Sequence, residues 1–262
     1  MIANYHTHTP RCKHAVGDER EYVEQAIEGG LKILGFSDHV PIPYEGSYRS
    51  PVRMDVSELE SYVDAVLAVK KEYAREIEIH LGFEVEYHPR YIDAQLSLFK
   101  PYPIEFFLLG QHFPADEEEG PYSGFLTRSD EVLKTYVRTC KTAMETGLFT
   151  YFAHPDLIYY EGDEALYERE MRSLCAYAKA AGMPLEINLL GIEDGRNYPK
   201  EAFWRIAGET GCAAVLGSDA HRPGNVYRED AIRAGEALAE RNGLPILETV
   251  PLIRPEKART QG

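Results

Sequence analysis

Histidine is the residue type whose positions in this chain most directly suggest chemistry. The sequence contains nine histidines among 262 residues. Seven of them, with three other polar residues, fall at the end of an apolar segment of strand length or in the loop just after it. These ten residues are His6, His8, His14, His39, Glu84, His112, His154, Asn188, Asp219 and His221. Neutral imidazoles and carboxylates are ligands that suit zinc, manganese and iron, so the pattern predicts a metal site.

The spacing within two of these motifs allows paired residues to reach the same ion. Side chains of an extended segment point to the same face at every second residue. His6 and His8 are two residues apart, and so are Asp219 and His221. Leaving Asn188 aside, the ligand candidates exceed what one tetrahedral ion needs, so we expect two or three divalent ions. We expect zinc, with manganese or iron as alternatives.

The elements that must position these residues are alternating strands and helices. Short, nearly continuous apolar runs are typical of strands covered on both faces. They predict strands at residues 2–6, 32–36, 78–85, 105–110, 149–153, 184–189 and 213–217. Helical patterns lie between them at residues 18–29, 56–75, 129–145, 165–181, 199–209 and 228–241. Asp18 and Ser129 are predicted N-caps of two of these helices.

Seven strand–helix units in this length predict one domain over residues 1–262 with an α/β fold. Parallel βα units either open into a doubly wound sheet or close into a barrel. No Gly-x-Gly-x-x-Gly turn follows the first predicted strand, which argues against a dinucleotide-binding sheet. We therefore expect a barrel, in which the carboxyl ends of the strands meet at one mouth. The polar residues described above fall at that mouth.

Composition excludes several other classes of protein. With 28 basic and 43 acidic residues, the net charge of −15 argues against a nucleic-acid partner. No apolar run reaches the length of a membrane span, and the first residues lack the features of a secretory signal. The four cysteines form no Cys-x-x-Cys pair. We therefore expect a cytoplasmic protein with free thiols and no membrane partner, and we predict no particular oligomeric state.

Taken together, the motifs resemble those of the polymerase-and-histidinol-phosphatase (PHP) family of metallo-phosphoesterases, in order, from about residue 2 to residue 224. The segments that carry the resemblance are His6-Thr7-His8-Thr9, Cys12-Lys13-His14, Phe36-Ser37-Asp38-His39, Gly82-Phe83-Glu84-Val85-Glu86-Tyr87, Gly110-Gln111-His112, Ala153-His154-Pro155 and Gly217-Ser218-Asp219-Ala220-His221. The first and last parts are most similar to the monofunctional histidinol-phosphatase branch.

This resemblance implies a distorted seven-stranded (β/α)7 TIM-like barrel with a trinuclear metal site. It implies that the first ion is held by His6, His8, Glu84 and Asp219. Glu84 is then expected to bridge to a second ion, whose other ligands are His112 and His154. The implied ligands of the third ion are His14, His39 and His221. His80 and His88 have no counterpart in the family pattern and are expected to be structural or exposed.

The implied activity is that of a metal-dependent phosphatase acting on a small phosphate monoester. The expected reaction converts L-histidinol phosphate to L-histidinol and phosphate, in histidine biosynthesis, through a hydroxide activated by the metal ions. The candidate catalytic residues are Glu84, His154, Asp219 and His221. The candidate substrate-binding residues are Arg196, Arg222 and Asn188. Relatives often carry Asn-x-x-Gly-Leu-Arg after the sixth strand, where this chain has Glu193, so Arg196 is the candidate to replace that arginine.

Two alternatives to this reading remain open. The same chemistry could act on another phosphomonoester, such as a nucleotide, a sugar phosphate or the phosphotyrosine of a protein. The chain could instead be a metal-binding module without catalytic activity. The complete set of nine ligand candidates favours the enzyme.

Overall fold

The structure, a computed structural model, describes residues 1–118 and 120–255. Within these residues one parallel sheet has seven strands that follow each other in sequence order. The strands are β1 (Ala3–Asn4), β2 (Ile33–Phe36), β3 (Glu78–Val85), β4 (Phe106–Leu109), β5 (Tyr151–Phe152), β6 (Leu185–Asn188) and β7 (Ala214–Gly217). Each lies inside its predicted range, because a strand buried on both faces has a distinctive apolar run.

The sheet curls until its first and last strands nearly meet. Thr7, just after β1, forms an isolated parallel bridge with Ala220, just after β7. The His8 amide donates to the Ala220 carbonyl at 3.0 Å, and the Ala220 amide donates to the His6 carbonyl at 3.2 Å. The predicted (β/α)7 TIM-like barrel is confirmed as a nearly closed barrel of seven parallel strands.

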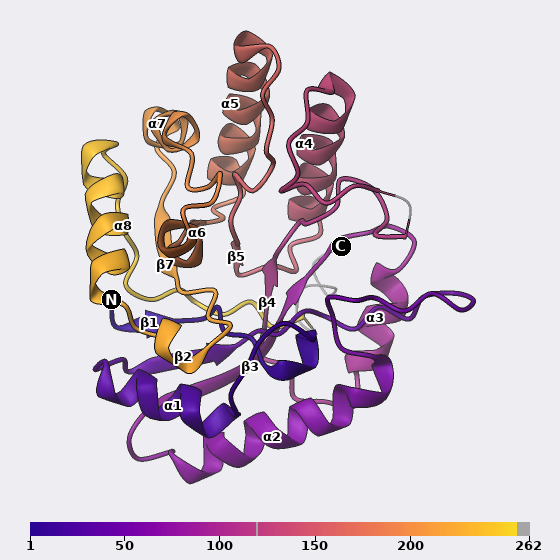
Figure 1. Cartoon of the computed structure of the whole chain (residues 1–262), viewed down its shortest axis with the longest axis vertical. Coiled ribbons are helices and arrows are strands. Elements are labelled where there is room, and N and C mark those ends of the chain that lie inside the picture. The colour runs from indigo at the N-terminus through magenta and orange to yellow at the C-terminus, as the bar shows by residue number, and fades with distance from the viewer. Residues whose placement is uncertain (119, 256–262) are drawn as a thin grey trace.

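Helices cover the outside of the sheet, and each strand is followed by at least one. The α-helices within the described residues are α1 (Glu19–Glu28), α2 (Leu59–Glu72), α3 (Ile92–Phe99), α4 (Asp130–Glu145), α5 (Glu164–Ala180), α6 (Leu189–Asp194), α7 (Glu201–Thr210) and α8 (Glu229–Arg241). Short 3-10 helices are η1 (Pro10–Cys12), η2 (Val56–Glu58) and η3 (Pro223–Asn225). Figure 1 shows α1 and α2 on one side of the strands and α4, α5, α7 and α8 on the other.

Local sequence explains where several helices begin. Asp18 caps α1 with a reciprocal capping box that includes Glu21, and Ser129 caps α4 by accepting from the Val132 amide. Both predicted N-caps are confirmed. The helices α3 and α6 were not predicted, because they are only eight and six residues long and show too little of the helical period.

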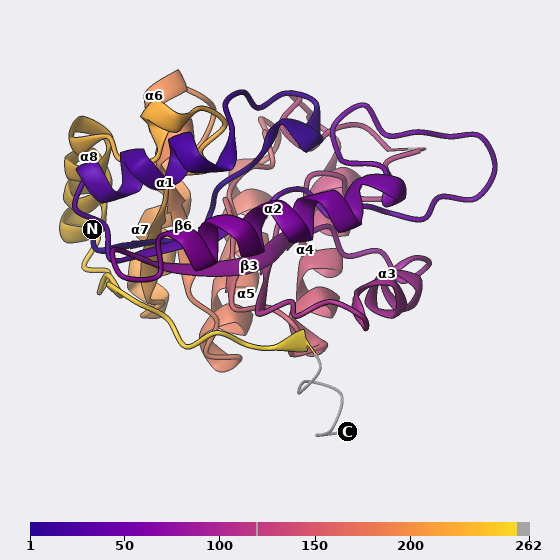
Figure 2. The same ribbon diagram turned by 90° about the horizontal axis from the view of Figure 1, so that it is seen from below.

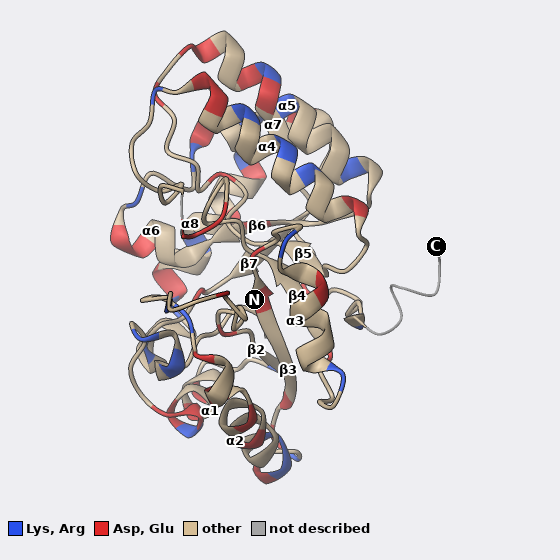
Figure 3. Ribbon diagram, turned by 90° about the vertical axis from the view of Figure 1, so that its right-hand side faces the viewer, with Lys and Arg blue, Asp and Glu red and all other residues tan. Residues whose placement is uncertain are grey.

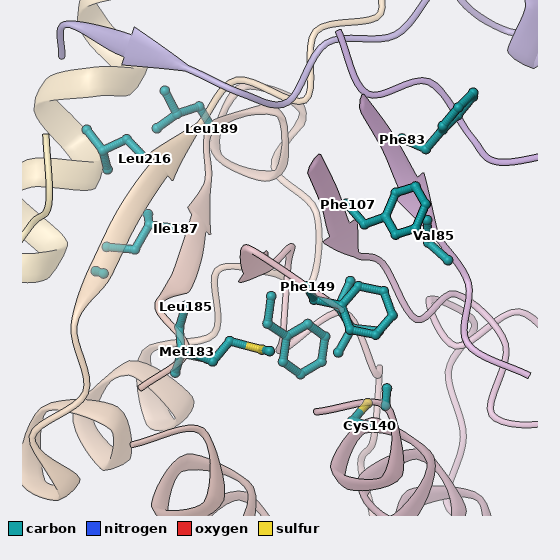
Figure 4. Packing of buried hydrophobic residues seen from close by; sticks show 14 of the residues in the cluster. Phe83, Val85, Phe107, Cys140, Phe149, Met183, Leu185, Ile187, Leu189 and Leu216 are labelled. Atoms are coloured by element: carbon teal, nitrogen blue, oxygen red, sulfur yellow. The ribbon is translucent and has the colours of Figure 1, made fainter. Parts of the chain in front are cut away.

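Apolar side chains fill the space between the sheet and its helices. In Figure 4, Phe149 lies beside Met183 and Phe107 lies beside Val85, on the side of the strands that faces the helix carrying Cys140. All four cysteines are buried and free, as predicted. No helix in residues 1–118 and 120–255 is long and apolar enough to cross a membrane.

The end of the barrel opposite the strand carboxyl ends is closed by the C-terminal segment. Val250 and Leu252 pack on a cluster that includes Tyr5 and Phe106 in the barrel interior. The Leu247 amide donates to the carbonyl of Ala214, at the start of β7. Figure 2 shows this segment, in yellow, running along the outside of the strands. The cavity described below opens at the other end of the barrel.

A partly buried ion pair between Lys70 and Glu105, on the outside of the barrel, makes stability depend on pH. Glu105 precedes β4 and accepts from Lys70 Nζ at 2.5 Å and from the Leu81 amide at 3.0 Å, with His80 Nδ1 at 3.1 Å. Burial alone would raise the pKa of Glu105, but the hydrogen bonds from His80, Lys70 and Leu81 outweigh it and lower the pKa to about 2. These contacts also account for His80, which lies outside the predicted ligand set.

Replacing Glu105 by glutamine is therefore expected to destabilise the protein in a pH-dependent way. The ordinary pKa is 4.5 and the folded-state value about 2, so the carboxylate stabilises the fold above pH 4.5 and loses that effect as pH falls towards 2. Urea unfolding should show Glu105→Gln less stable by about 1–2 kcal/mol at pH 7, with the gap narrowing on acidification. Glu78→Gln, at an exposed carboxylate beside His80, is the matched control with little effect at any pH. A gap that does not narrow below pH 4.5 contradicts the assignment.

Candidate metal centre

The open end of the barrel brings all nine predicted ligand residues together. They come from the ends of β1, β2, β3, β4, β5 and β7 and from the loop after η1. Neighbouring imidazole rings lie close, with centroids 4.0 Å apart for His8 and His221 and 4.9 Å apart for His112 and His154. The link between these groups is His39, whose ring is 4.4 Å from that of His8 and 5.0 Å from that of His112. The cluster is therefore continuous across the mouth.

Glu84 lies at the centre of this cluster. Its Oε1 is 2.7 Å from His154 Nε2 and 3.4 Å from His112 Nε2. Its Oε2 is 2.9 Å from His39 Nδ1 and 3.5 Å from His6 Nε2. The side chain is only 1% exposed. A carboxylate whose two oxygens face different histidines has the arrangement needed to bridge two cations.

A second carboxylate, Asp219, closes the other side of the cluster. Its Oδ1 is 3.1 Å from His8 Nε2 and 3.4 Å from both His6 Nε2 and His221 Nδ1. The backbone at Asp219 has φ of 48°, and that at His154 has φ of 32°. Residues other than glycine rarely adopt a positive φ. Backbone strain of this kind is concentrated at functional sites. Both residues are therefore held in conformations that direct their side chains into the cluster.

A second layer of acidic residues orients the histidines. In three of them Nδ1 faces a carboxylate outside the cluster: His6 faces Glu186 at 2.7 Å, His8 faces Asp38 at 3.4 Å and His112 faces Glu86 at 3.0 Å. Such contacts fix the ring orientation and leave Nε2 free for a ligand. None of these three acids was among the site residues predicted from the sequence. The signal available for Glu186 was an acidic residue inside the buried run Leu185–Asn188.

Charge within the cluster is balanced between buried acids and bases. Burial alone would lower the pKa of His6, but Glu186, Asp219 and Glu84 overcome it and raise the pKa to about 10. Burial likewise opposes ionisation of Glu84, but the surrounding histidines, His112 first, hold its pKa well below the ordinary value. The pKa of Asp219 is lowered in the same way. Both carboxylates are therefore ionised at neutral pH.

Several atoms of the cluster fit a bound cation better than any protein partner. His6 Nε2, His8 Nε2 and Glu84 Oε2 are buried and make no hydrogen bond within the described part of the chain, although each lies near another ligand atom of the cluster. Buried polar atoms without partners are costly unless a ligand satisfies them. Five sets of residues have ligand atoms within 4.8 Å of one another. They are His6, His8 and Asp219; His6, Glu84 and His154; His14, His39 and His221; His8, His39 and Glu84; and His8, Cys12 and His221. The donor set of imidazoles and carboxylates suits zinc, manganese or iron.

A cavity of about 630 Å³ opens beside the cluster. The candidate substrate-binding residues Arg196 and Arg222 both line it. Arg196 is held in place by the Tyr198 hydroxyl at 2.8 Å and by Asp194 Oδ2 at 2.8 Å. The aromatic residues Phe113, Tyr122 and Phe125 line the cavity as well. It therefore combines cationic and aromatic walls beside the histidines.

The third substrate-binding candidate, Asn188, lies behind the cluster and does not line this cavity. It is 1% exposed, and its amide nitrogen donates to Glu186 Oε2 and Asp219 Oδ2, both at 3.1 Å. Its oxygen accepts from the Gly191 amide and caps α6. Glu193 is also absent from the cavity lining and accepts a hydrogen bond from Asn225. Arg196 is thus the arginine that this segment places at the cavity.

The close packing of Gly110 against Glu84 leads to a direct test of the cluster. A Cβ atom at Gly110 would lie 2.1 Å from Glu84 Oε1 and 2.5 Å from its carboxyl carbon. Because histidines surround Glu84, its carboxylate cannot move away from the added methyl group without clashing with them. Gly110→Ala is expected to lower the affinity for divalent metal by about 10- to 100-fold, as measured by competition with a chelating dye. Gly224→Ala is the control, because a Cβ there meets nothing within 4 Å. Equal metal affinity in both variants would count against the central place of Glu84.

Comparison with known proteins identifies the family of this chain. The family model described as "PHP domain" matches residues 4–189. The chain is 32% identical over 241 residues to a probable histidinol-phosphatase of Deinococcus radiodurans, covering 86% of this chain and 88% of that protein. It is 28% identical over 254 residues to the histidinol-phosphatase of Bacillus subtilis, covering 84% and 94%.

The fold is also found among solved structures. A histidinol phosphate phosphatase from Lactococcus lactis, complexed with zinc, L-histidinol and phosphate, superposes with a TM-score of 0.74 at 18% identity. The match covers 97% of this chain and 98% of that one. At this identity the likeness concerns the fold. On the extent of the family match and the identity to the Deinococcus protein, this chain belongs to the PHP domain family.

Proposed function

We propose that this protein is a metal-dependent phosphatase that hydrolyses L-histidinol phosphate to L-histidinol and phosphate. The observation that carries the proposal is the convergence of seven histidines, Glu84 and Asp219 beside a cavity with cationic and aromatic walls. The relatives known as histidinol-phosphatases match this chain over most of their length.

In this proposal the nine clustered residues hold two or three divalent ions. The first set is His6, His8, Glu84 and Asp219, the second is Glu84, His112 and His154, and the third is His14, His39 and His221. Zinc is the proposed metal because the donor set suits it and because the Lactococcus structure contains zinc. When bound, such ions lower the pKa of water and neutralise charge on a phosphoryl group.

The protein's own groups supply orientation and charge. Glu84 and Asp219 stay ionised at neutral pH, and the second layer of acids keeps the histidine rings fixed. Arg196 is clamped by Asp194 and Tyr198, and its guanidinium offers directed donors to a phosphate. Arg222 lines the same cavity. In this proposal, these two arginines bind the phosphoryl oxygens.

The rest of the cavity suits a small organic leaving group. Its volume of about 630 Å³ is typical of a small-molecule site. Phe113, Tyr122 and Phe125 can pack against a planar ring such as imidazole. Acidic and basic residues are mixed over the outer helices in Figure 3. Together with the net charge of −15, this surface disfavours a long polyanion such as nucleic acid.

The test is phosphate release from a panel of substrates by the zinc-loaded protein. The panel contains L-histidinol phosphate, p-nitrophenyl phosphate, a nucleoside monophosphate, a sugar phosphate and a phosphotyrosine peptide. We expect kcat/KM for L-histidinol phosphate to exceed the others by about 100-fold. A higher kcat/KM for another ester would identify that ester as the preferred substrate and contradict the proposal. Bound zinc without turnover of any ester would indicate a metal-binding module.

A further inference from the structure

The loop between β2 and η2, residues 37–55, contains an arginine that lines the cavity. This loop contains no helix or strand. The loop projects from the body of the molecule in Figure 2. Its residue Arg53 lines the cavity together with His39 and His112. Arg53 is 1% exposed, which is rare for an arginine and requires partners for its charge.

A single carboxylate, Glu117 in the loop after β4, holds the inner side of this segment. It accepts from the Tyr44 hydroxyl at 2.7 Å, the Tyr48 hydroxyl at 3.1 Å and the Ser50 hydroxyl at 2.5 Å. It also accepts from Arg53 Nε at 2.6 Å. The two loops are therefore joined at one point, and that point fixes the Arg53 guanidinium.

The opposite edge of the guanidinium is fixed by Glu86. Arg53 Nη2 donates to Glu86 Oε2 at 2.9 Å, and His112 Nδ1 lies 3.0 Å from the same oxygen. Glu86 thus links Arg53 to a proposed metal ligand, His112. With Nε and Nη2 both engaged, the remaining nitrogen, Nη1, is buried and has no partner within the described residues.

We propose that Arg53 is a substrate-binding residue whose Nη1 donates a hydrogen bond to a phosphoryl oxygen of the ester. The inference deepens the proposed function and rests on it. The unpartnered donor belongs to a residue of the cavity wall, which His39 and His112 also line. A phosphoryl group held in this cavity by the metal cluster would supply the missing acceptor.

The charges around Arg53 indicate what kind of contact this is. Glu86 and Glu117 carry one more negative charge than the guanidinium neutralises. The group of three therefore does not attract an anion through net charge, and its contribution is a donor of fixed direction. Because the contact is to the phosphoryl group, its loss should affect esters with different leaving groups equally.

The experiment compares Arg53→Lys with the wild type in their zinc-loaded forms. Lysine keeps the positive charge between the two carboxylates but cannot offer a third directed nitrogen. We expect inorganic phosphate to bind the variant about 10- to 100-fold more weakly, by calorimetry and by the phosphate-induced rise in melting temperature. kcat/KM for L-histidinol phosphate and p-nitrophenyl phosphate should fall by the same factor. Arg49→Lys is the matched control on the same loop, since Arg49 is exposed and bonds only the Tyr48 carbonyl among the described residues.

Each outcome decides for or against this role. Phosphate affinity that is unchanged in zinc-loaded Arg53→Lys overturns the proposal, and so does a loss confined to L-histidinol phosphate, which would indicate contact with the leaving group. If Arg53→Lys does not fold, Glu117→Gln keeps the arginine but weakens its anchor, and unchanged phosphate affinity there overturns the proposal instead. A wild type that binds phosphate through Arg53 but does not hydrolyse L-histidinol phosphate would defeat the proposed function alone.

Discussion

Replacing Asp219 by asparagine is expected to lower kcat by about 10³-fold while the fold is retained. Asp219 Oδ1 lies within 3.4 Å of His6 Nε2, His8 Nε2 and His221 Nδ1, so the variant removes the one negative charge these three rings share. Asparagine is preferable to alanine because the backbone here has φ of 48°, a region that asparagine tolerates.

The measurement is phosphate release under saturating substrate with excess zinc, together with circular dichroism and thermal melting. The Asn188 contact to Oδ2 at 3.1 Å can be kept by the amide oxygen, so the melting temperature should change little. Asp230→Asn, at an exposed carboxylate that pairs with Arg228, is the control with normal turnover. Near-normal turnover in Asp219→Asn would contradict the proposed mechanism.

Removal of metal is expected to have an even larger effect, abolishing activity and lowering the melting temperature. Without metal, His6 Nε2, His8 Nε2 and Glu84 Oε2 are buried and make no hydrogen bond to the described residues. Ligands present at about 1,000 times their dissociation constant stabilise a protein by about 4 kcal/mol. For a chain of this size such a change corresponds to about 10 °C in melting temperature.

The test is dialysis against a chelator, followed by calorimetric melting and by titration with zinc, manganese or iron(II). Activity and melting temperature should return together, and the number of equivalents that restores them gives the number of ions. Arg49→Lys should respond to chelation like the wild type. A chelated protein with full activity would rule out a metal-dependent reaction.

Much of the barrel was predictable because each strand is buried on both faces. All seven strands lie inside their predicted ranges, since a continuous apolar run bounded by polar residues leaves little choice of structure. The helices α3 and α6 were not predicted, because such short segments show too little of the helical period. Asn188 looked like the polar end of a strand, and its role as a helix cap depends on a hydrogen bond to Gly191 that only the folded chain forms.

The predicted ligands could be named from sequence because each one lies at the end of a strand or in the loop beyond it, and parallel strands in a barrel end at the same mouth. The assembly of His6 with His154 or His14 with His221 depends on that rule and on no local contact. The acidic residues that orient the histidines could not be predicted from the sequence. Glu186 and Glu86 are distinguished from other acidic residues only by their contacts with His6 and His112 in the folded chain.

The alternation of strands and helices and the polar residues at the strand ends could be predicted from the sequence, because both depend on local hydrophobicity and spacing. The pairing of histidines with carboxylates, the position of Asn188 outside the cavity lining and the attachment of Arg53 to Glu117 and Glu86 emerge only in the folded chain. These contacts join residues far apart in the chain. Their geometry follows from barrel closure and from two irregular loops that carry no periodic signal.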